Sequence, residues 1–185
     1  MVKRIRFKSK PIVLFGDSAL RTVCTPVEVF HKGLHEKVDL MAHTLKKHGG
    51  GAALAAPQIG LLKNIIVIHY LSKYYELINP VITECNGSIS DIEGCLSLPN
   101  FIGRVNRYQK IKVQYQNRFG DPFEIETENE MARCFQHEID HLNGVLYIDR
   151  KTEEYVYNPD TNEKIAVQQL LELTNNSSGP PQTIG

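Results

Sequence analysis

The stretch CFQHEIDHLNG, residues 134–144, restricts the fold of this chain more than any other feature. His137 and His141 are four residues apart, so on an α-helix both imidazoles project from the same face. Glu138 follows the first histidine directly and can reach a water molecule held near that face. The stretch therefore predicts a helix that binds a metal ion through two histidines.

The third protein ligand of this site is not fixed by the stretch itself. In one class of such sites a third histidine follows at a set distance, but Tyr147 occupies that place here. Another class takes a glutamate from a later segment. Four glutamates are available for that role: Glu153, Glu154, Glu163 and Glu172. Cys95, in DIEGCLSLPN (91–100), is the other candidate, because thiolate sulfur binds zinc-like or ferrous ions well.

Length and composition exclude several classes of protein. The chain has 185 residues, 42% of them hydrophobic, which suits one domain with one sizeable core. Its 21 basic and 21 acidic residues give no indication of a nucleic-acid or membrane surface. No segment is long enough to cross a membrane, and the apolar run PIVLF near the start is too short for a secretion signal. We therefore expect a cytoplasmic protein rather than a secreted metalloprotease.

The four cysteines show no regular spacing: Cys24, Cys85, Cys95 and Cys134. In a chain without an evident export signal, this pattern favours reduced thiols over a disulfide framework. One of the four is then free to bind a metal, and the other three are expected to be structural.

Segments of alternating or β-branched residues indicate an antiparallel meander. The predicted strands are NIIVIHY (64–70), YELINPVI (75–82), IKVQYQ (111–116) and FEIET (123–127). Asn86-Gly87 predicts a hairpin turn, and VLYID (145–149) predicts a further short strand.

Three other segments predict helices. Leucine, valine and methionine recur at three- and four-residue spacing over about 34–48, before three consecutive glycines. Two later helices are expected at about 130–142 and 163–174, and the polar tail 175–185 is expected to be disordered. Because strands precede helices without βαβ alternation, the chain is expected to be a single α+β domain.

Three stretches together resemble the signature motifs of the peptide deformylase family, in the same order and spacing. They are GAALAAPQIG (51–60), EGCLS (93–97) and QHEIDH (136–141). The segment GDSALRTVCTPV (16–27) is similar to the family's N-terminal motif, and the resemblance covers roughly residues 11–150. It implies antiparallel sheets packed around a central metal-binding helix, with residues 1–174 as the catalytic domain.

The resemblance also implies a role for each matching position. Cys95, His137 and His141 would hold one divalent metal ion, usually Fe²⁺, for which Zn²⁺, Ni²⁺ or Co²⁺ can substitute. Glu138 would act as general base and then as general acid. The side chain of Gln58 and the backbone N–H of Leu96 would stabilise the oxyanion. The methionine pocket would be bordered by Ala52, Ala53, Leu54, Arg133 and Cys134, unless Arg133 points to solvent.

The implied activity is hydrolysis of the N-formyl group from the N-terminal methionine of new peptides, with release of formate. The partners would be N-formylmethionyl nascent chains, which places the protein transiently near the ribosome. Two alternatives remain: a related hydrolase of another formylated amine, and a peptide-binding relative that has lost catalysis. The second is disfavoured because the expected metal ligands, Gln58 and Glu138 are all present.

The chain departs from the family pattern at a few positions. Ala53 replaces a glycine, and its methyl group would protrude where substrate backbone is expected to lie. Ser18 replaces a proline, and Asn100 and Asn129 replace glycines; asparagine tolerates left-handed backbone geometry well. The resemblance also implies a structural ion pair between Glu93 and Arg107, which we expect to hold the loop around the metal.

Overall fold

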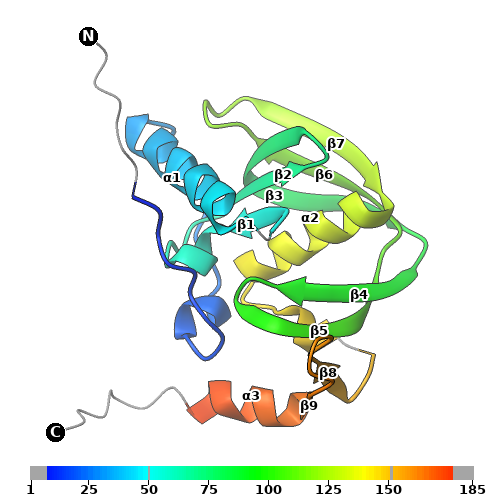
Figure 1. The fold of residues 1–185 in the computed structure, drawn as a ribbon. Helices are drawn as coiled ribbons and strands as arrows, with labels where there is room; N and C mark the ends of the chain where they lie inside the picture. The colour runs from blue at the N-terminus through cyan, green and yellow to red at the C-terminus, as the bar shows by residue number, and fades with distance from the viewer. Residues whose placement is uncertain (1–7, 50, 151, 177–185) are drawn as a thin grey trace, which may run out of the picture.

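Two antiparallel sheets enclose a single helix in the computed structural model, which describes residues 8–49, 51–150 and 152–176 (Figure 1). The larger sheet has the order β1-β2-β3-β6-β7. Its strands are β1 (Ala53–Ala55), β2 (Ile65–Tyr70), β3 (Lys73–Asn86), β6 (Lys110–Gln116) and β7 (Pro122–Glu128). The smaller sheet, β4-β5-β8-β9, consists of β4 (Ile89–Cys95), β5 (Leu98–Arg107), β8 (Tyr155–Tyr157) and β9 (Lys164–Ala166). The predicted α+β class with antiparallel sheets around a central helix is confirmed.

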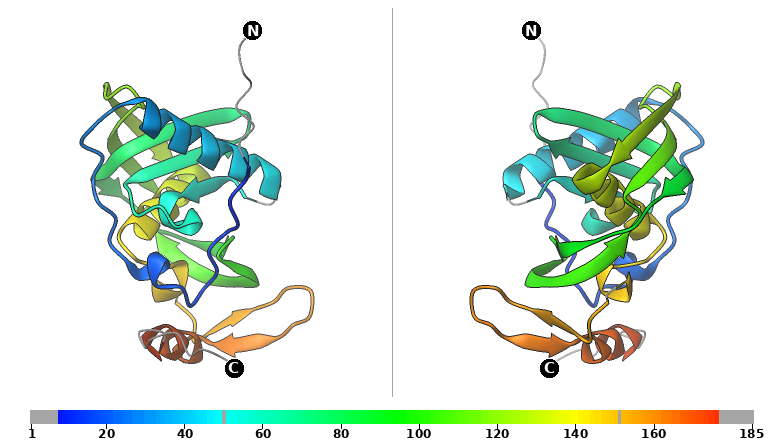
Figure 2. Two further views of the ribbon diagram at one scale, coloured as in Figure 1. Left: turned by 90° about the vertical axis from the view of Figure 1, so that its left-hand side faces the viewer. Right: turned by 90° about the vertical axis from the view of Figure 1, so that its right-hand side faces the viewer.

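The helices cover different parts of this frame. The described residues form three α-helices: α1 (Lys32–His48), α2 (Asn129–Leu142) and α3 (Val167–Asn176). They also form three short 3₁₀ helices: η1 (Ser18–Arg21), η2 (Ala56–Ile59) and η3 (Tyr147–Arg150). The β8–β9 hairpin and α3 lie at the end of the molecule opposite α1 (Figure 2). Within the described residues, no helix is long and apolar enough to span a membrane.

The run IIVI in β2 is apolar throughout because both faces of the larger sheet are covered. Ile66 and Ile68 pack against α2, in a cluster with Phe135. Ile65 and Val67 point the other way and pack against α1. Successive side chains of β2 therefore enter two separate core clusters, one on each face of the sheet. The cluster that contains Ile66 and Ile68 fixes the position of α2 against the sheet.

The two most periodic helices are where the sequence predicts them. α1 ends at His48, and Gly49 closes it with a left-handed φ of 65°. α2 begins one residue before its predicted start and ends at Leu142 as predicted. The left-handed conformation expected to be tolerated at Asn100 and Asn129 is present, with φ of 69° and 55°.

Three local predictions were wrong. The turn at Asn86-Gly87 does not join paired strands, because β3 pairs with β2 and β6 while β4 pairs with β5. A turn sequence predicts that the chain reverses direction, but it does not predict which strand the next strand pairs with. Here the chain passes from the larger sheet to the smaller sheet. VLYID (145–149) is not a strand: most of it lies in η3, where Asp149 accepts a hydrogen bond from the Leu146 N–H at 2.7 Å.

The third correction concerns the segment 163–174, which is not helical from its start. Lys164–Ala166 forms β9 because β8 lies beside it and completes an antiparallel ladder. α3 follows and extends to Asn176, so it includes the first two residues of the expected tail. The rest of that tail, 177–185, lies outside the described residues.

Gly144 should be the glycine least tolerant of substitution. Its φ is +71°, and a Cβ there would lie 2.6 Å from the backbone oxygen of Arg21. Gly60 has a similar φ of +75°, but a Cβ there meets nothing within 4 Å. Strain alone costs about 1–2 kcal/mol in the left-handed region, and overpacking adds about 1–3 kcal/mol.

We therefore expect Gly144→Ala to lower the free energy of unfolding by about 3 kcal/mol and the Tm by about 6–12 °C. Gly60→Ala is the matched control and should show only the smaller cost of strain. Thermal unfolding of both variants checks this, and an equal Tm for the two would show that the Arg21 backbone yields to the added methyl group.

Candidate metal centre

α2 carries the central polar groups of the site on a helix that is otherwise enclosed by protein. Every residue from Phe135 to Leu142 is buried. His137 is 9% exposed, Glu138 5% and His141 1%. Burial of three such groups costs free energy unless each finds a partner, so this helix face indicates a binding site rather than a surface.

Cys95 completes a three-donor cluster with the two histidines. Cys95 is the last residue of β4 and pairs with Leu98 across the tight turn into β5. One ligand atom from each of Cys95, His137 and His141 lies within 4.8 Å of the others, and the Cys95 Sγ is 3.3 Å from the His141 Nε2. One sulfur and two nitrogens suit a zinc-like or ferrous ion.

The alternative third ligands are not near this cluster. Glu153, Glu154, Glu163 and Glu172 are all exposed, and Glu153 pairs with Arg104 at 3.6 Å. Tyr147 lies next to His137, with ring centroids 6.2 Å apart, but its hydroxyl donates to the carbonyl of Phe101 at 3.0 Å. Among the described residues, the only group of three or more side chains with this geometry is the Cys95 cluster.

The chemistry of the donor set fits a cation. Burial raises the pKa of the Cys95 thiol, but the two neighbouring imidazoles outweigh it and hold that pKa well below its ordinary value. A thiolate is the form of cysteine that binds a metal. Two buried polar atoms of this site, Glu138 Oε2 and His141 Nδ1, have no hydrogen-bond partner among the described residues. Both observations fit a site built to receive an ion, water and substrate.

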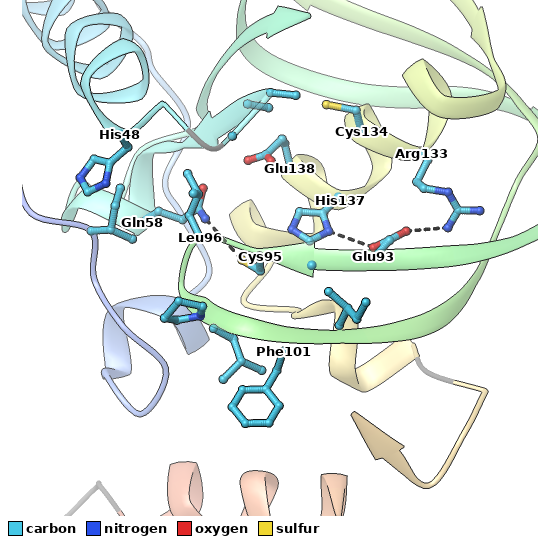
Figure 3. Close-up of a pocket in the computed structure, with 18 of the residues that line it drawn as sticks. His48, Gln58, Glu93, Cys95, Leu96, Phe101, Arg133, Cys134, His137 and Glu138 are labelled. Carbon is cyan, nitrogen blue, oxygen red and sulfur yellow. Dashed lines mark hydrogen bonds and ion pairs between the residues drawn. The ribbon is translucent and has the colours of Figure 1, made fainter. Parts of the chain in front are cut away.

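Glu138 points into the space beside Cys95 and His137 (Figure 3). Burial raises the pKa of this carboxyl group above its ordinary value, although the nearby imidazoles partly counteract the effect. A raised pKa and a free oxygen make this carboxylate a better proton acceptor than an exposed glutamate, as a group that takes up a proton and returns it requires.

Glu93 holds His137 in its orientation. Glu93 Oε2 lies 2.9 Å from His137 Nδ1, so that ring nitrogen donates its proton to the carboxylate and leaves Nε2 for the metal. Two guanidinium groups hold the same carboxylate, Arg107 with two contacts of 2.9 Å and Arg133 with one of 2.9 Å. Burial favours the neutral acid, but Arg107 and His137 outweigh it and keep the pKa of Glu93 well below its usual range.

The sequence predicted the ion pair between Glu93 and Arg107 but not the contact of Glu93 with His137. Glu93 and Cys95 are two apart in β4, so they share one face of the strand. That spacing could have predicted that Glu93 lies near the metal ligands, but only if the packing of β4 against α2 had been known. Asp140, inside the histidine motif, was also missed: it binds Arg150 and the same Arg107 that holds Glu93.

We expect Glu93→Gln to weaken metal binding about 10–100-fold, the usual effect of removing a group that orients a metal-binding histidine. The amide can still fill the space, but it no longer carries the charge that fixes the His137 tautomer. Competition with a chromophoric chelator measures the Kd. Glu84→Gln, at an exposed carboxylate paired with Lys112, is the control and should bind metal as the wild type does.

Gln58 and Leu96 border the same cleft as Glu138 and lie near Cys95 (Figure 3). Gln58 is 1% exposed, and its Oε1 accepts the Ala55 N–H at 2.8 Å. That bond directs its Nε2 toward the Cys95 Sγ at 3.5 Å. The Leu96 side chain packs over Gly51, where a Cβ would lie 2.8 Å from Leu96 Cδ1. Glycine at 51 therefore makes room for Leu96.

A cleft of about 920 Å³ opens beside these groups. Four of the five expected pocket residues border it: Ala52, Ala53, Arg133 and Cys134. Leu54 does not, because alternation along β1 turns its side chain into the core beneath α1. Arg133 does not point to solvent, since it binds Glu93 and the carbonyls of Val105 and Ile89.

Ala53 is 6% exposed and packs in the cluster between α2 and the larger sheet. Protein therefore covers most of this residue, but Ala53 also borders the cleft. The expected protrusion of its methyl group into the substrate path stays a prediction.

Comparison with known proteins identifies the family of this fold and site. The sequence model of the polypeptide deformylase family matches residues 9–156. A peptide deformylase of Heliobacterium modesticaldum is 43% identical over 139 residues, 75% of this chain and 91% of that protein. One from Caldicellulosiruptor bescii is 43% identical over 141 residues, 76% of this chain and 84% of that protein.

Solved structures agree with this match. The crystal structure of peptide deformylase from Thermotoga maritima has a TM-score of 0.76 at 40% identity, covering 79% of this chain and 99% of that chain. One from Thermus thermophilus has a TM-score of 0.75 at 38% identity, covering 91% of this chain and 94% of that chain. The matched region includes both sheets' principal strands, α2 and the three-donor cluster. This chain therefore belongs to the polypeptide deformylase family.

Proposed function

We propose that this protein is a peptide deformylase, a metal-dependent hydrolase that removes the formyl group from the N-terminal methionine of newly made peptides. Membership of the family supports the reaction class. The observation that carries the proposal is the buried Glu138 carboxylate, unpaired beside the donors of Cys95, His137 and His141. That combination suits activation of water against a small carbonyl group.

Cys95, His137 and His141 hold one divalent ion in this proposal, with Fe²⁺ as the resident metal and Zn²⁺, Ni²⁺ or Co²⁺ as substitutes. When bound, the ion supplies Lewis acidity and lowers the pKa of water. Three protein donors are the number typical of catalytic rather than structural metal sites. Glu93 keeps the His137 ring oriented toward that ion.

Glu138 moves the protons of the reaction. Its carboxylate accepts a proton from the attacking water, whose oxygen forms a bond with the formyl carbon. The same carboxyl group then gives the proton to the departing amine as the C–N bond breaks, which leaves formate and a free N-terminus. Because burial raises the pKa of Glu138, the group is suited to both transfers, first as base and then as acid.

Gln58 Nε2 and the backbone N–H of Leu96 stabilise the negative charge that develops on the formyl oxygen. The anchored Gln58 amide supports this role, since its Oε1 is already bound to the Ala55 N–H and its donor remains directed at the site. Removing one such donor typically costs about 10²–10³ in rate. Ala52, Ala53, Arg133 and Cys134 border the pocket for the methionine side chain.

The substrates are nascent N-formylmethionyl chains, which would bring the protein near the ribosome in the cytoplasm. Formate release from formyl-Met-Ala-Ser tests the proposal, with acetyl-Met-Ala-Ser and unformylated Met-Ala-Ser as controls. We expect one new free amine for each formate, slow or absent deacetylation, and no cleavage between residues. Cleavage of the unformylated peptide would instead indicate a peptidase. Turnover of other formylated amines but not of formyl-Met-Ala-Ser would show that the proposed substrate class is wrong.

A further inference from the structure

One face of α2 forms a continuous wall of the cleft. Glu138, Cys134 and Glu130 are spaced four residues apart, so they lie one above another along the helix. All three border the cleft. At 1.5 Å per residue, the eight residues from Glu138 to Glu130 span about 12 Å. The cleft therefore extends about two helical turns from the reacting groups toward the start of α2.

Tyr70 closes the far end of this wall. It is the last residue of β2, it borders the cleft, and its ring packs against the same core cluster as Cys134. Its hydroxyl donates a hydrogen bond to the Glu130 carboxylate and so connects the end of β2 to the first turn of α2. Among the described residues, Tyr70 is the only side chain hydrogen-bonded to that carboxylate.

The length of a methionine fits this distance. Six bonds separate the formyl carbon from the terminal methyl carbon, which corresponds to about 8 Å for an extended chain with bonds near 1.5 Å. The span from Glu138 to Glu130 is about 12 Å. With the formyl carbon level with Glu138, about 4 Å remains between the methionine methyl group and the level of Glu130, which is an ordinary contact distance. A side chain one or two methylenes longer would meet the Tyr70 ring or displace it.

We propose that the Tyr70–Glu130 pair is the end wall of the pocket for the first side chain and sets the longest side chain that the enzyme accepts. The proposal rests on the proposed deformylase function and adds a specificity determinant to it. Glu130 is exposed and Tyr70 is partly exposed, so solvent lies behind the wall. Removing either side chain therefore opens the pocket without leaving a closed cavity in the core.

A series of formyl peptides with lengthened first residues tests this wall: norvaline, norleucine, methionine, 2-aminoheptanoate and 2-aminooctanoate. The nickel-loaded wild type should show its highest kcat/KM at norleucine and methionine. In Tyr70→Ala the maximum should move to the longer residues, with the 2-aminooctanoate-to-norleucine ratio rising at least about 10-fold, the usual effect of one methylene. Tyr70→Phe keeps the ring and should shift the ratio only slightly.

Glu130→Ala opens the same wall from the helix side and provides a second test if Tyr70→Ala folds poorly. Tyr74→Ala is the matched control, because the Tyr74 hydroxyl bonds Glu76 at 2.9 Å within β3 and does not border the cleft. Its length profile should equal that of the wild type. An unchanged profile in both Tyr70→Ala and Glu130→Ala would overturn the proposal.

Binding separates this proposal from the proposed function. In a nickel-loaded Glu138→Gln background, the Kd of each formyl peptide can be measured by calorimetry without turnover. The wall predicts the same dependence on side-chain length in these Kd values, and the same shift on adding Tyr70→Ala. Absence of formate release by the wild type would count against the proposed function. Kd values whose dependence on side-chain length is the same with and without Tyr70→Ala would count against the end wall alone.

Discussion

Glu138→Gln is expected to lower kcat for formate release by about 10⁴-fold, at the upper end for loss of a general acid–base group, since one carboxyl group serves both proton transfers. The amide has the same shape, so the buried position of the side chain should be retained, but it cannot accept the proton of water. Because Glu138 is not among the three clustered donors, nickel content should remain at one ion per chain. Steady-state formate release and elemental analysis of the same sample measure the two quantities.

Glu128→Gln is the control for this variant. It makes the same chemical change at an exposed residue that precedes α2, and kcat should remain at the wild-type value. A Glu138→Gln variant within 10-fold of the wild type would contradict the assignment and would point to another proton acceptor in the cleft.

Cys95→Ala is expected to abolish stoichiometric metal binding and, with it, activity. Two neutral imidazoles remain, and the only anionic ligand of the cluster is lost, so affinity for a divalent ion should fall sharply. Elemental analysis after gel filtration measures the metal content. In the cobalt-substituted wild type, a sulfur-to-cobalt charge-transfer band should be visible, and this band should be absent from the variant.

Cys85→Ala is the matched control, because Cys85 is exposed on β3 and lies outside the cluster. It should bind one ion per chain and retain the charge-transfer band. If Cys95→Ala kept one tightly bound ion, the third ligand would be a different residue, and the four downstream glutamates would have to be reconsidered.

The parts of the fold that the sequence predicted are those with a strong local pattern. α1 and α2 follow from hydrophobic spacing at three and four residues. β2, β3, β6 and β7 follow from alternating or β-branched residues, whereas β4 and β5 were not predicted. The pairing of strands did not follow, because it depends on segments far apart: β6 rather than β4 lies beside β3. Similarly, Lys164–Ala166 is extended only because β8 pairs with it.

In the candidate site, too, local sequence patterns predicted some residues, whereas others depend on contacts between distant segments. The histidine spacing and the motif resemblance named Cys95, His137 and His141, and these three side chains come together. The position of Glu93 between two arginines and His137 required the packing of the smaller sheet against α2. The resemblance placed both Ala53 and Leu54 at the pocket, but strand alternation sends the two side chains to opposite faces.

The most direct test of the account is the rate of formate release from formyl-Met-Ala-Ser as metal-free protein is titrated with Ni²⁺. We expect the initial rate to rise linearly and to stop rising at one ion per chain, while Glu138→Gln takes up the same single ion with almost no formate. A fully loaded wild type that releases no formate, or a metal-free protein that releases it at the same rate, would contradict the account.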